Sequence, residues 1–276
     1  MSDGVEEYRG KEIVVRFDGR KCIHSRNCML GRPDVFVPNA PGPWIKPDNA
    51  AAETIAAIAL SCPSGAIAYE RLDGGPQETT PPVNVVRIRE NGPLAFHAEL
   101  AIEGEEPAFR ATLCRCGASR RKPYCDGSHA AAQFAATGEP ATQESSPLPA
   151  RDGALAVKPL RNGPLMIGGS LEIVSGTGRT VTRVSEAFLC RCGGSANKPF
   201  CDGSHKRIGF EAEGTERPKK PAALQSGDRA PNPQRRIVDP PFPAARAGPA
   251  AYSREIGNRQ VADWLVSRPP LAGRIA

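Results

Sequence analysis

The chain has 276 residues, a formal net charge of +6, only 5% aromatic residues, and 28 glycines and 28 prolines. This composition argues against one large core and favours several small, loop-rich modules. The chain opens on the polar stretch MSDGVEEYRG and has no apolar run long enough to cross a membrane, so we expect a soluble cytoplasmic protein with no membrane contact.

The first predicted element is a strand over residues 12–17, where EIVVRF alternates in hydrophobicity. A turn and Cys22 follow it. A helix is predicted to begin at residues 47–49 and to lead to Cys62, and residues 66–71 are predicted to form a return strand.

Three cysteines are placed along this first region. Five residues separate Cys22 from Cys28, and Cys62 stands directly before a proline. Bacterial ferredoxins use a C-x2-C-x2-C run with a distant Cys-Pro, and here Ser25 stands where the middle cysteine would be. The spacing indicates a cluster site, and buried apolar cysteines are the alternative.

Residues 9–71 thus resemble the divergent single-cluster ferredoxins, including the three-cysteine type that serves cytochromes P450. The resemblance implies a [3Fe-4S] cluster held by Cys22, Cys28 and Cys62, or a [4Fe-4S] cluster whose fourth iron takes His24, Ser25 or a water. His24 also fits a loop histidine that hydrogen-bonds to the backbone.

A sixteen-residue cassette then occurs twice, and each copy contains the spacing C-x-C followed by C-x3-H. The four positions of the first copy all recur 76 residues later. We expect a proline turn to bring the chain back, and an Asp-Gly turn to start a short helix with the last cysteine and the histidine on one face. Repeated soft ligands predict a metal site in each copy. The candidate ligands are Cys114, Cys116, Cys125 and His129 in the first copy, and Cys190, Cys192, Cys201 and His205 in the second.

Both cassettes are similar to the CDGSH iron-sulfur (NEET) family, whose pattern C-x-C-x2-(S/T)-x3-P-x-C-D-G-(S/A/T)-H they match throughout. The resemblance implies two [2Fe-2S] clusters, one in each cassette. In each, the C-x-C pair would hold one iron, and the later cysteine and histidine would hold the other. Three cysteines and a histidine can also bind structural zinc, although this spacing is unusual for zinc fingers. A disulfide framework is disfavoured by the odd count of nine cysteines.

The repeat extends beyond the cassettes, because the tetrapeptide NGPL occurs at residues 91–94 and again at 162–165. This offset is 71 residues, so the second copy contains five extra residues, which we place in a hairpin at residues 175–178. Each module is predicted to be a small antiparallel β unit with its cluster loop at one end. Since the NEET unit is a two-fold dimer, the resemblance implies an intrachain pseudo-dimer.

The predicted fold class is α+β, built from small β-rich modules. The tail has 11 Lys and Arg against four acids over residues 217–276. Its prolines and lack of interleaved aromatic residues favour disorder over nucleic-acid binding. The predicted parts are a ferredoxin-like domain at 9–73, CDGSH modules at 82–138 and 153–215, and a basic Pro-rich, mostly disordered tail at 216–276.

We expect a multi-cluster iron-sulfur protein that carries electrons between redox partners, such as a reductase or an oxidoreductase. No phosphate loop, flavin site or nucleophile-base pair stands out, so no enzyme activity is predicted. The alternatives are a cluster donor to an apo iron-sulfur acceptor, a redox or pH sensor, and a zinc-binding interaction module. Because imidazole is neutral, the cassette clusters should have higher potentials than the first cluster.

Overall fold

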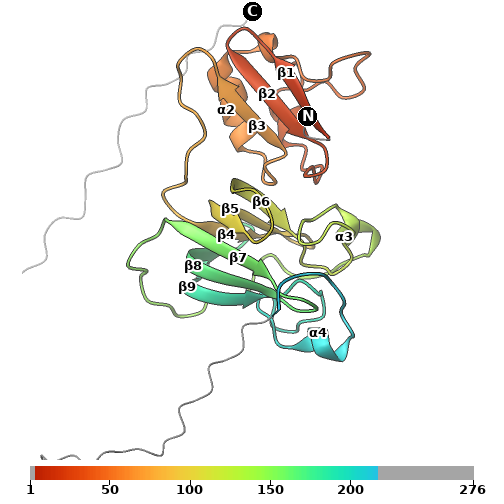
Figure 1. The fold of residues 1–276 in the computed structure, drawn as a ribbon, viewed down its shortest axis with the longest axis vertical. Coiled ribbons are helices and arrows are strands. Elements are labelled where there is room, and N and C mark those ends of the chain that lie inside the picture. The colour runs from red at the N-terminus through yellow and green to blue at the C-terminus, as the bar shows by residue number, and fades with distance from the viewer. Residues whose placement is uncertain (1–3, 217–276) are drawn as a thin grey trace, which may run out of the picture. The chain divides into compact units, whose positions relative to one another are not determined.

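The structure is a computed structural model that describes residues 4–216. Within this range the chain forms small β-rich modules joined by loops and short helices, as the sequence predicts (Figure 1). Beyond its first residue, the predicted basic tail lies outside the described residues. No helix between residues 4 and 216 is long and apolar enough to cross a membrane.

The N-terminal domain is a three-stranded antiparallel sheet in the order β1-β2-β3, covered by a helix. Its elements are β1 (Val5–Arg9), β2 (Ile13–Asp18), α1 (Asn27–Gly31), the 3-10 turn η1 (Pro47–Asn49), α2 (Ala52–Leu60) and β3 (Ile67–Arg71). Ile13 and Val15 of β2 pack with Ile55 of α2 in the core. Both predicted strands are therefore present. The edge strand β1 was not predicted, because it has no buried residue and hence no buried face to show in the sequence.

The predicted helix begins later than the sequence suggested. Residues 47–49 form a separate 3-10 turn, and Ala50 is extended (φ −150°, ψ 163°) before α2 begins. The Asn49 amide donates to the Asp34 carbonyl at 2.7 Å, and the Asp48 carboxylate accepts from the Lys11 N–H at 2.8 Å. These contacts hold the turn against neighbouring loops and separate it from the helix.

The two CDGSH modules contribute three strands each to one six-stranded sheet. The first has β4 (Val85–Ile88), β5 (Leu94–Ile102), β6 (Ala108–Leu113) and α3 (Ser128–Ala131), and the second has β7 (Ala154–Pro159), β8 (Leu165–Val174), β9 (Thr180–Leu189) and α4 (Ser204–Arg207). The β8–β9 hairpin turns at residues 175–179, but this turn is no longer than the β5–β6 turn at 103–107. The five extra residues lengthen the strands instead, so their predicted position at 175–178 is wrong.

The modules exchange strand pairings reciprocally. Strand β4 pairs antiparallel with β5 of its own module and parallel with β8 of the other. Strand β7 in turn pairs antiparallel with β8 and parallel with β5. The buried side chains of both modules form a single hydrophobic cluster, which includes Val86, Phe96, Val157 and Ile167. The two modules therefore share one core.

The cassettes also meet directly, backbone to backbone. Cys116 and Cys192 form an antiparallel bridge, and a glycine follows each of them. A Cβ on Gly117 would lie 2.5 Å from the Cys192 carbonyl oxygen, and Gly193 approaches the Cys116 carbonyl just as closely. A side chain at either glycine would push the cassettes apart.

One buried arginine, Arg110 of β6, fastens the N-terminal domain to the first module. Its guanidinium donates to the carbonyls of Ala59, Cys62 (2.8 Å) and Ile67 (3.0 Å). It also forms an ion pair with Glu78 at 2.6 Å, and its side chain is only 4% exposed. Arg110 thus supplies donors to the carbonyls at the end of α2, at Cys62 and at the start of β3.

We predict that Arg110→Met lowers the free energy of unfolding by about 3–5 kcal/mol, because it leaves the Glu78 carboxylate and three carbonyls without their donor. Chemical denaturation measures the loss. Arg16→Met is the control, since Arg16 is 39% exposed in its ion pairs with Glu7 and Glu70 and should cost about 1 kcal/mol or less. Equal losses in the two variants would contradict the assigned role of Arg110.

We further predict that Gly117→Ala destabilises the protein more than Gly127→Ala. Both glycines have a left-handed φ (84° and 85°), so both variants incur about 1–2 kcal/mol of backbone strain. Only Gly117 faces the other cassette, which adds about 1–3 kcal/mol of overpacking. Thermal unfolding compares the two variants, and equal destabilisation would mean that the close approach of the cassettes is unimportant.

Candidate metal centres

The candidate ligands of each cassette form two close pairs. In the first cassette the sulfurs of Cys114 and Cys116 lie 3.7 Å apart, and the Cys125 sulfur lies 3.4 Å from Nδ1 of His129. The second cassette repeats both pairs, at 3.7 Å for Cys190 and Cys192 and at 3.3 Å for Cys201 and His205.

These distances suit two ligands on one ion. Two thiolates bound tetrahedrally at about 2.3 Å from an ion lie about 3.8 Å apart. Across the described residues, no three Cys, His, Asp or Glu side chains are grouped to hold a single ion. Each cassette therefore presents two pairs of ligands, and the spacing within each pair suits a shared ion.

Two backbone hydrogen bonds fold the cassette loop back onto its strand. The N–H of Cys114 donates to the Pro123 carbonyl at 2.8 Å, and the N–H of Cys125 donates to the Thr112 carbonyl at 2.9 Å. The Ser119 hydroxyl donates to the carbonyl of the residue before Cys125. The loop thereby brings the C-x-C pair and the later cysteine to the same end of the module.

The sequence predicted that Cys125 and His129 lie together because they share a helix face, and this prediction is wrong. Helix α3 begins at Ser128, so Cys125 precedes it and does not share a helix face with His129. Gly127 instead turns the chain with φ 85°, and the Asp126 carboxylate accepts from the Ser128 N–H at 3.0 Å. The cysteine and the histidine meet because of this left-handed turn.

The arginine between the two cysteines of C-x-C is a site residue that the sequence reasoning missed. Arg115 is 1% exposed, as is its counterpart Arg191. Burial lowers the pKa of Arg115 to about 10, so it remains charged at neutral pH. Its guanidinium donates to the carbonyls of Arg89, Gly92, Ala136 and Thr137. The sequence could have indicated this role, because an arginine stands between the two cysteines of C-x-C in both cassettes.

The thiols within each C-x-C pair differ in acidity. The hydrogen bond from Cys116, together with backbone N–H groups of the loop, lowers the pKa of Cys114, and Cys192 does the same for Cys190. Burial raises the pKa of Cys125 to about 11. Since metals bind the thiolate, loading the cassette releases protons.

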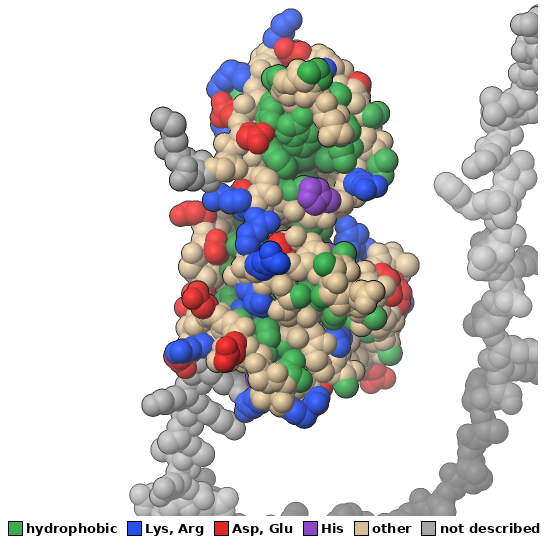
Figure 2. All heavy atoms as spheres, turned by 90° about the vertical axis from the view of Figure 1, so that its right-hand side faces the viewer, with side chains coloured by type: hydrophobic (Ala, Val, Ile, Leu, Met, Phe, Trp, Pro, Cys, Tyr) green, Lys and Arg blue, Asp and Glu red, His purple; other side chains and the backbone are tan. Residues whose placement is uncertain are grey.

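The three cysteines of the N-terminal domain line one cavity of about 320 Å³. Cys28 lies in α1, Cys62 follows α2, and Cys22 lies in the loop after β2. Hydrophobic side chains gather on one face of this domain (Figure 2), and Met29 and Trp44 line the cavity. Burial raises the pKa values of Cys22 and Cys28. An apolar cavity lined by three cysteines suits a cluster, whose binding would deprotonate them.

Further polar residues lie at this cavity. His24 lines it with Nδ1 4.0 Å from the Cys22 sulfur, in a left-handed conformation (φ 54°). The hydroxyl of Ser64 lies 3.6 Å from the Cys62 sulfur and is buried. Ser25 lines the cavity as well. The sequence reasoning named His24 and Ser25 but missed Ser64.

None of the nine cysteines forms a disulfide, and all are divided among the three sites. The remaining histidine, His97, lies at an exposed position of β5.

Comparison with known families agrees with this division. The family described as iron-binding zinc finger, CDGSH type, matches residues 82–130 and 162–206, and the divergent 4Fe-4S mono-cluster family matches residues 8–72. The uncharacterized protein YjdI of Escherichia coli K12 is 36% identical over 69 residues, which are 25% of this chain and 90% of YjdI. YjdI of E. coli O157:H7 matches to the same extent.

The matches cover all three candidate sites, and the paired ligands of the cassettes fit iron. The N-terminal domain therefore belongs to the divergent 4Fe-4S mono-cluster family, and two CDGSH-type iron-binding modules follow it in the same chain.

Proposed function

We propose that this iron-sulfur protein is an electron carrier, not an enzyme. The observation behind the proposal is a short hydrogen-bonded route between the first two sites. The Cys62 carbonyl accepts from Arg110 at 2.8 Å. Two residues further along β6, the Thr112 carbonyl accepts from the Cys125 N–H at 2.9 Å. A candidate ligand in the N-terminal domain is thus connected to one in the first cassette.

The second cassette adjoins the first through the bridge between Cys116 and Cys192. Lys122 of the first cassette lies 5.8 Å from the ring centroid of Phe210, and Lys198 of the second lies 5.9 Å from that of Phe134. These reciprocal cation-π contacts hold each cassette loop against the other module. Such an arrangement supports transfer along the chain and an intrachain pseudo-dimer.

For the cofactors, we propose a [2Fe-2S] cluster in each cassette and a [4Fe-4S] cluster in the N-terminal domain, with His24 as its fourth ligand. The two ligand pairs of each cassette support the first assignment. The N-terminal family and the position of His24 on the cavity support the second. When bound, the clusters supply one-electron chemistry.

The protein residues around the cassettes hold charge and exclude water. Arg115 and Arg191 are buried positive charges. The charge of Arg115 acts on Cys190 and Cys116, and that of Arg191 acts on Cys114, so each offsets thiolate charge in the other cassette. His129 and His205 are half-buried, so a redox partner can approach each cassette at its histidine. We propose a reductase or an oxidoreductase as the partner. Nine cysteines outside disulfides fit the reducing conditions of the cytoplasm, our proposed location.

The same half-buried positions favour a second candidate function. Cys116 and Cys192 are partly exposed like the histidines, so an apo iron-sulfur acceptor could reach the cluster ligands. A cluster donor would use this access to pass on iron, whereas a carrier keeps its iron.

We predict that protein purified anaerobically contains about eight irons and eight sulfides per chain, from two [2Fe-2S] clusters and one [4Fe-4S] cluster. Elemental and sulfide analysis together with electron paramagnetic resonance of the reduced protein measures this. A content of about seven irons with a [3Fe-4S] signal would contradict the proposed role of His24. A colourless protein with zinc would contradict iron-sulfur clusters altogether.

We also predict that the reduced protein passes electrons to a one-electron acceptor and retains its iron. The test mixes reduced protein with an oxidised haem protein in one sample and with an apo ferredoxin in another. Fast oxidation with no iron in the apo ferredoxin is expected of a carrier. Stoichiometric appearance of a cluster in the apo ferredoxin would identify a donor instead.

A further inference from the structure

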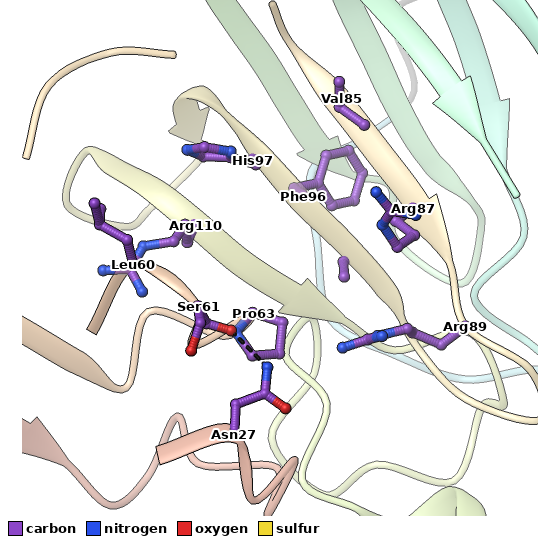
Figure 3. Close-up of a pocket in the computed structure, with 11 residues that line it drawn as sticks. Asn27, Leu60, Ser61, Pro63, Val85, Arg87, Arg89, Phe96, His97 and Arg110 are labelled. Carbon is purple, nitrogen blue, oxygen red and sulfur yellow. Dashed lines mark hydrogen bonds between the residues drawn. The ribbon is translucent and has the colours of Figure 1, made fainter. Parts of the chain in front are cut away.

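A second cavity, of about 390 Å³, lies where the N-terminal domain meets β4 and β5 (Figure 3). None of the candidate cluster ligands lines it. Asn27, Ser61 and Pro63 of the N-terminal domain form one wall. The opposite wall includes Arg87 and Arg89 from β4 and the segment after it. A cavity of this size is typical of small-molecule sites.

The lining of this cavity is strongly basic. It includes three arginines and a histidine, namely Arg87, Arg89, Arg110 and His97, and no carboxylate. Arg110 is neutralised by Glu78 behind it. Arg87 donates one hydrogen bond, to the Gly176 carbonyl at 3.2 Å. The cavity therefore has positive charge that the described residues leave without a counter-charge.

Of the arginines that line the cavity, Arg89 has the fewest hydrogen-bond partners. Its guanidinium makes no hydrogen bond or ion pair with any residue in the range 4–216, and in Figure 3 its side chain extends toward Pro63. Burial, and then the charge of Arg87, lowers the pKa of Arg89. Two arginines two residues apart, partly desolvated and without an anion, repel each other. A bound anion would relieve that repulsion.

The second CDGSH module shows that the fold does not require three of these four basic side chains. At the position equivalent to Arg89, 71 residues later, it has the buried Leu160. His97 pairs with Arg110 across β5 and β6, and the equivalent pair across β8 and β9 is Gly168 with Glu186. Arg89, His97 and Arg110 are thus particular to the module that meets the N-terminal domain, whereas Arg87 corresponds to the basic residue Lys158.

We propose that this cavity binds a small organic anion with phosphate or carboxylate groups, held by Arg87 and Arg89. The planar guanidinium matches both groups with paired hydrogen bonds, and it does so more strongly in a partly dry site. Leu60 and Pro63 offer an apolar surface for the rest of the ligand. Because Ser61 and Pro63 flank Cys62, the anion would lie beside the N-terminal cluster site. The proposal does not depend on electron transfer.

Titration calorimetry of the full chain, purified anaerobically with its iron, tests the proposal. The probes are inorganic pyrophosphate and citrate in separate titrations, at an ionic strength fixed with potassium chloride. We expect saturable one-to-one binding of at least one probe, and the preferred probe distinguishes phosphate from carboxylate chemistry. Arg89→Leu should weaken that binding at least about tenfold, which corresponds to about 1.4 kcal/mol, and Arg87→Gln should weaken it too.

The control is Arg161→Leu, because Arg161 is 66% exposed and ion-paired with Glu216 at the surface of the second module. Its affinity should equal that of the parent. Arg89→Leu introduces the residue type that the second module has at the equivalent position, Leu160. An unchanged visible absorption spectrum checks that the variant is folded and keeps its iron. No saturable binding by the parent, equal affinity in Arg89→Leu and the parent, or binding of polyglutamate but of neither probe would overturn the proposal.

Discussion

The contact between the backbones at Cys116 and Cys192 is the constraint on which the rest of the CDGSH unit depends. Carbonyls and glycines approach so closely there that no side chain fits between the cassettes. The contact is reciprocal, because each glycine faces the carbonyl of the cysteine in the other cassette. The reciprocal pairing of β4 with β8 and of β7 with β5 extends the same relationship through the sheet. One shared core then stabilises both cluster loops.

Buried arginines hold the cassette loops and the N-terminal domain in place. Arg115, Arg191 and Arg110 each donate to several backbone carbonyls that would otherwise be buried without a partner. A guanidinium suits this role because it has five donors in one rigid plane. In the cassettes it adds positive charge next to thiolates, and at Arg110 it joins two domains next to Cys62.

The sequence allowed prediction of features that repeat or alternate. The cassettes, the strands on both sides of Cys22 and Cys62, and the longer second hairpin followed from spacing and hydrophobic pattern. The parallel pairing of β4 with β8 could not be predicted, because it joins segments of different modules and leaves no local pattern. The late start of α2 depends on contacts of Asp48 and Asn49 with residues distant in the sequence. Ser64 was missed because a serine near a Cys-Pro turn is common and shows its burial only in the fold.

The central claim is that three sites in one chain form a single electron path, and the rate of electron exchange between clusters tests it most directly. One electron per chain is introduced photochemically, and its movement between the N-terminal cluster and the cassette clusters is followed by rapid-freeze electron paramagnetic resonance at several protein concentrations. The account predicts a rate that does not change with concentration, because Arg110 and the Cys116–Cys192 bridge connect the sites within the chain. A rate proportional to concentration would show that exchange occurs between molecules and would contradict the account.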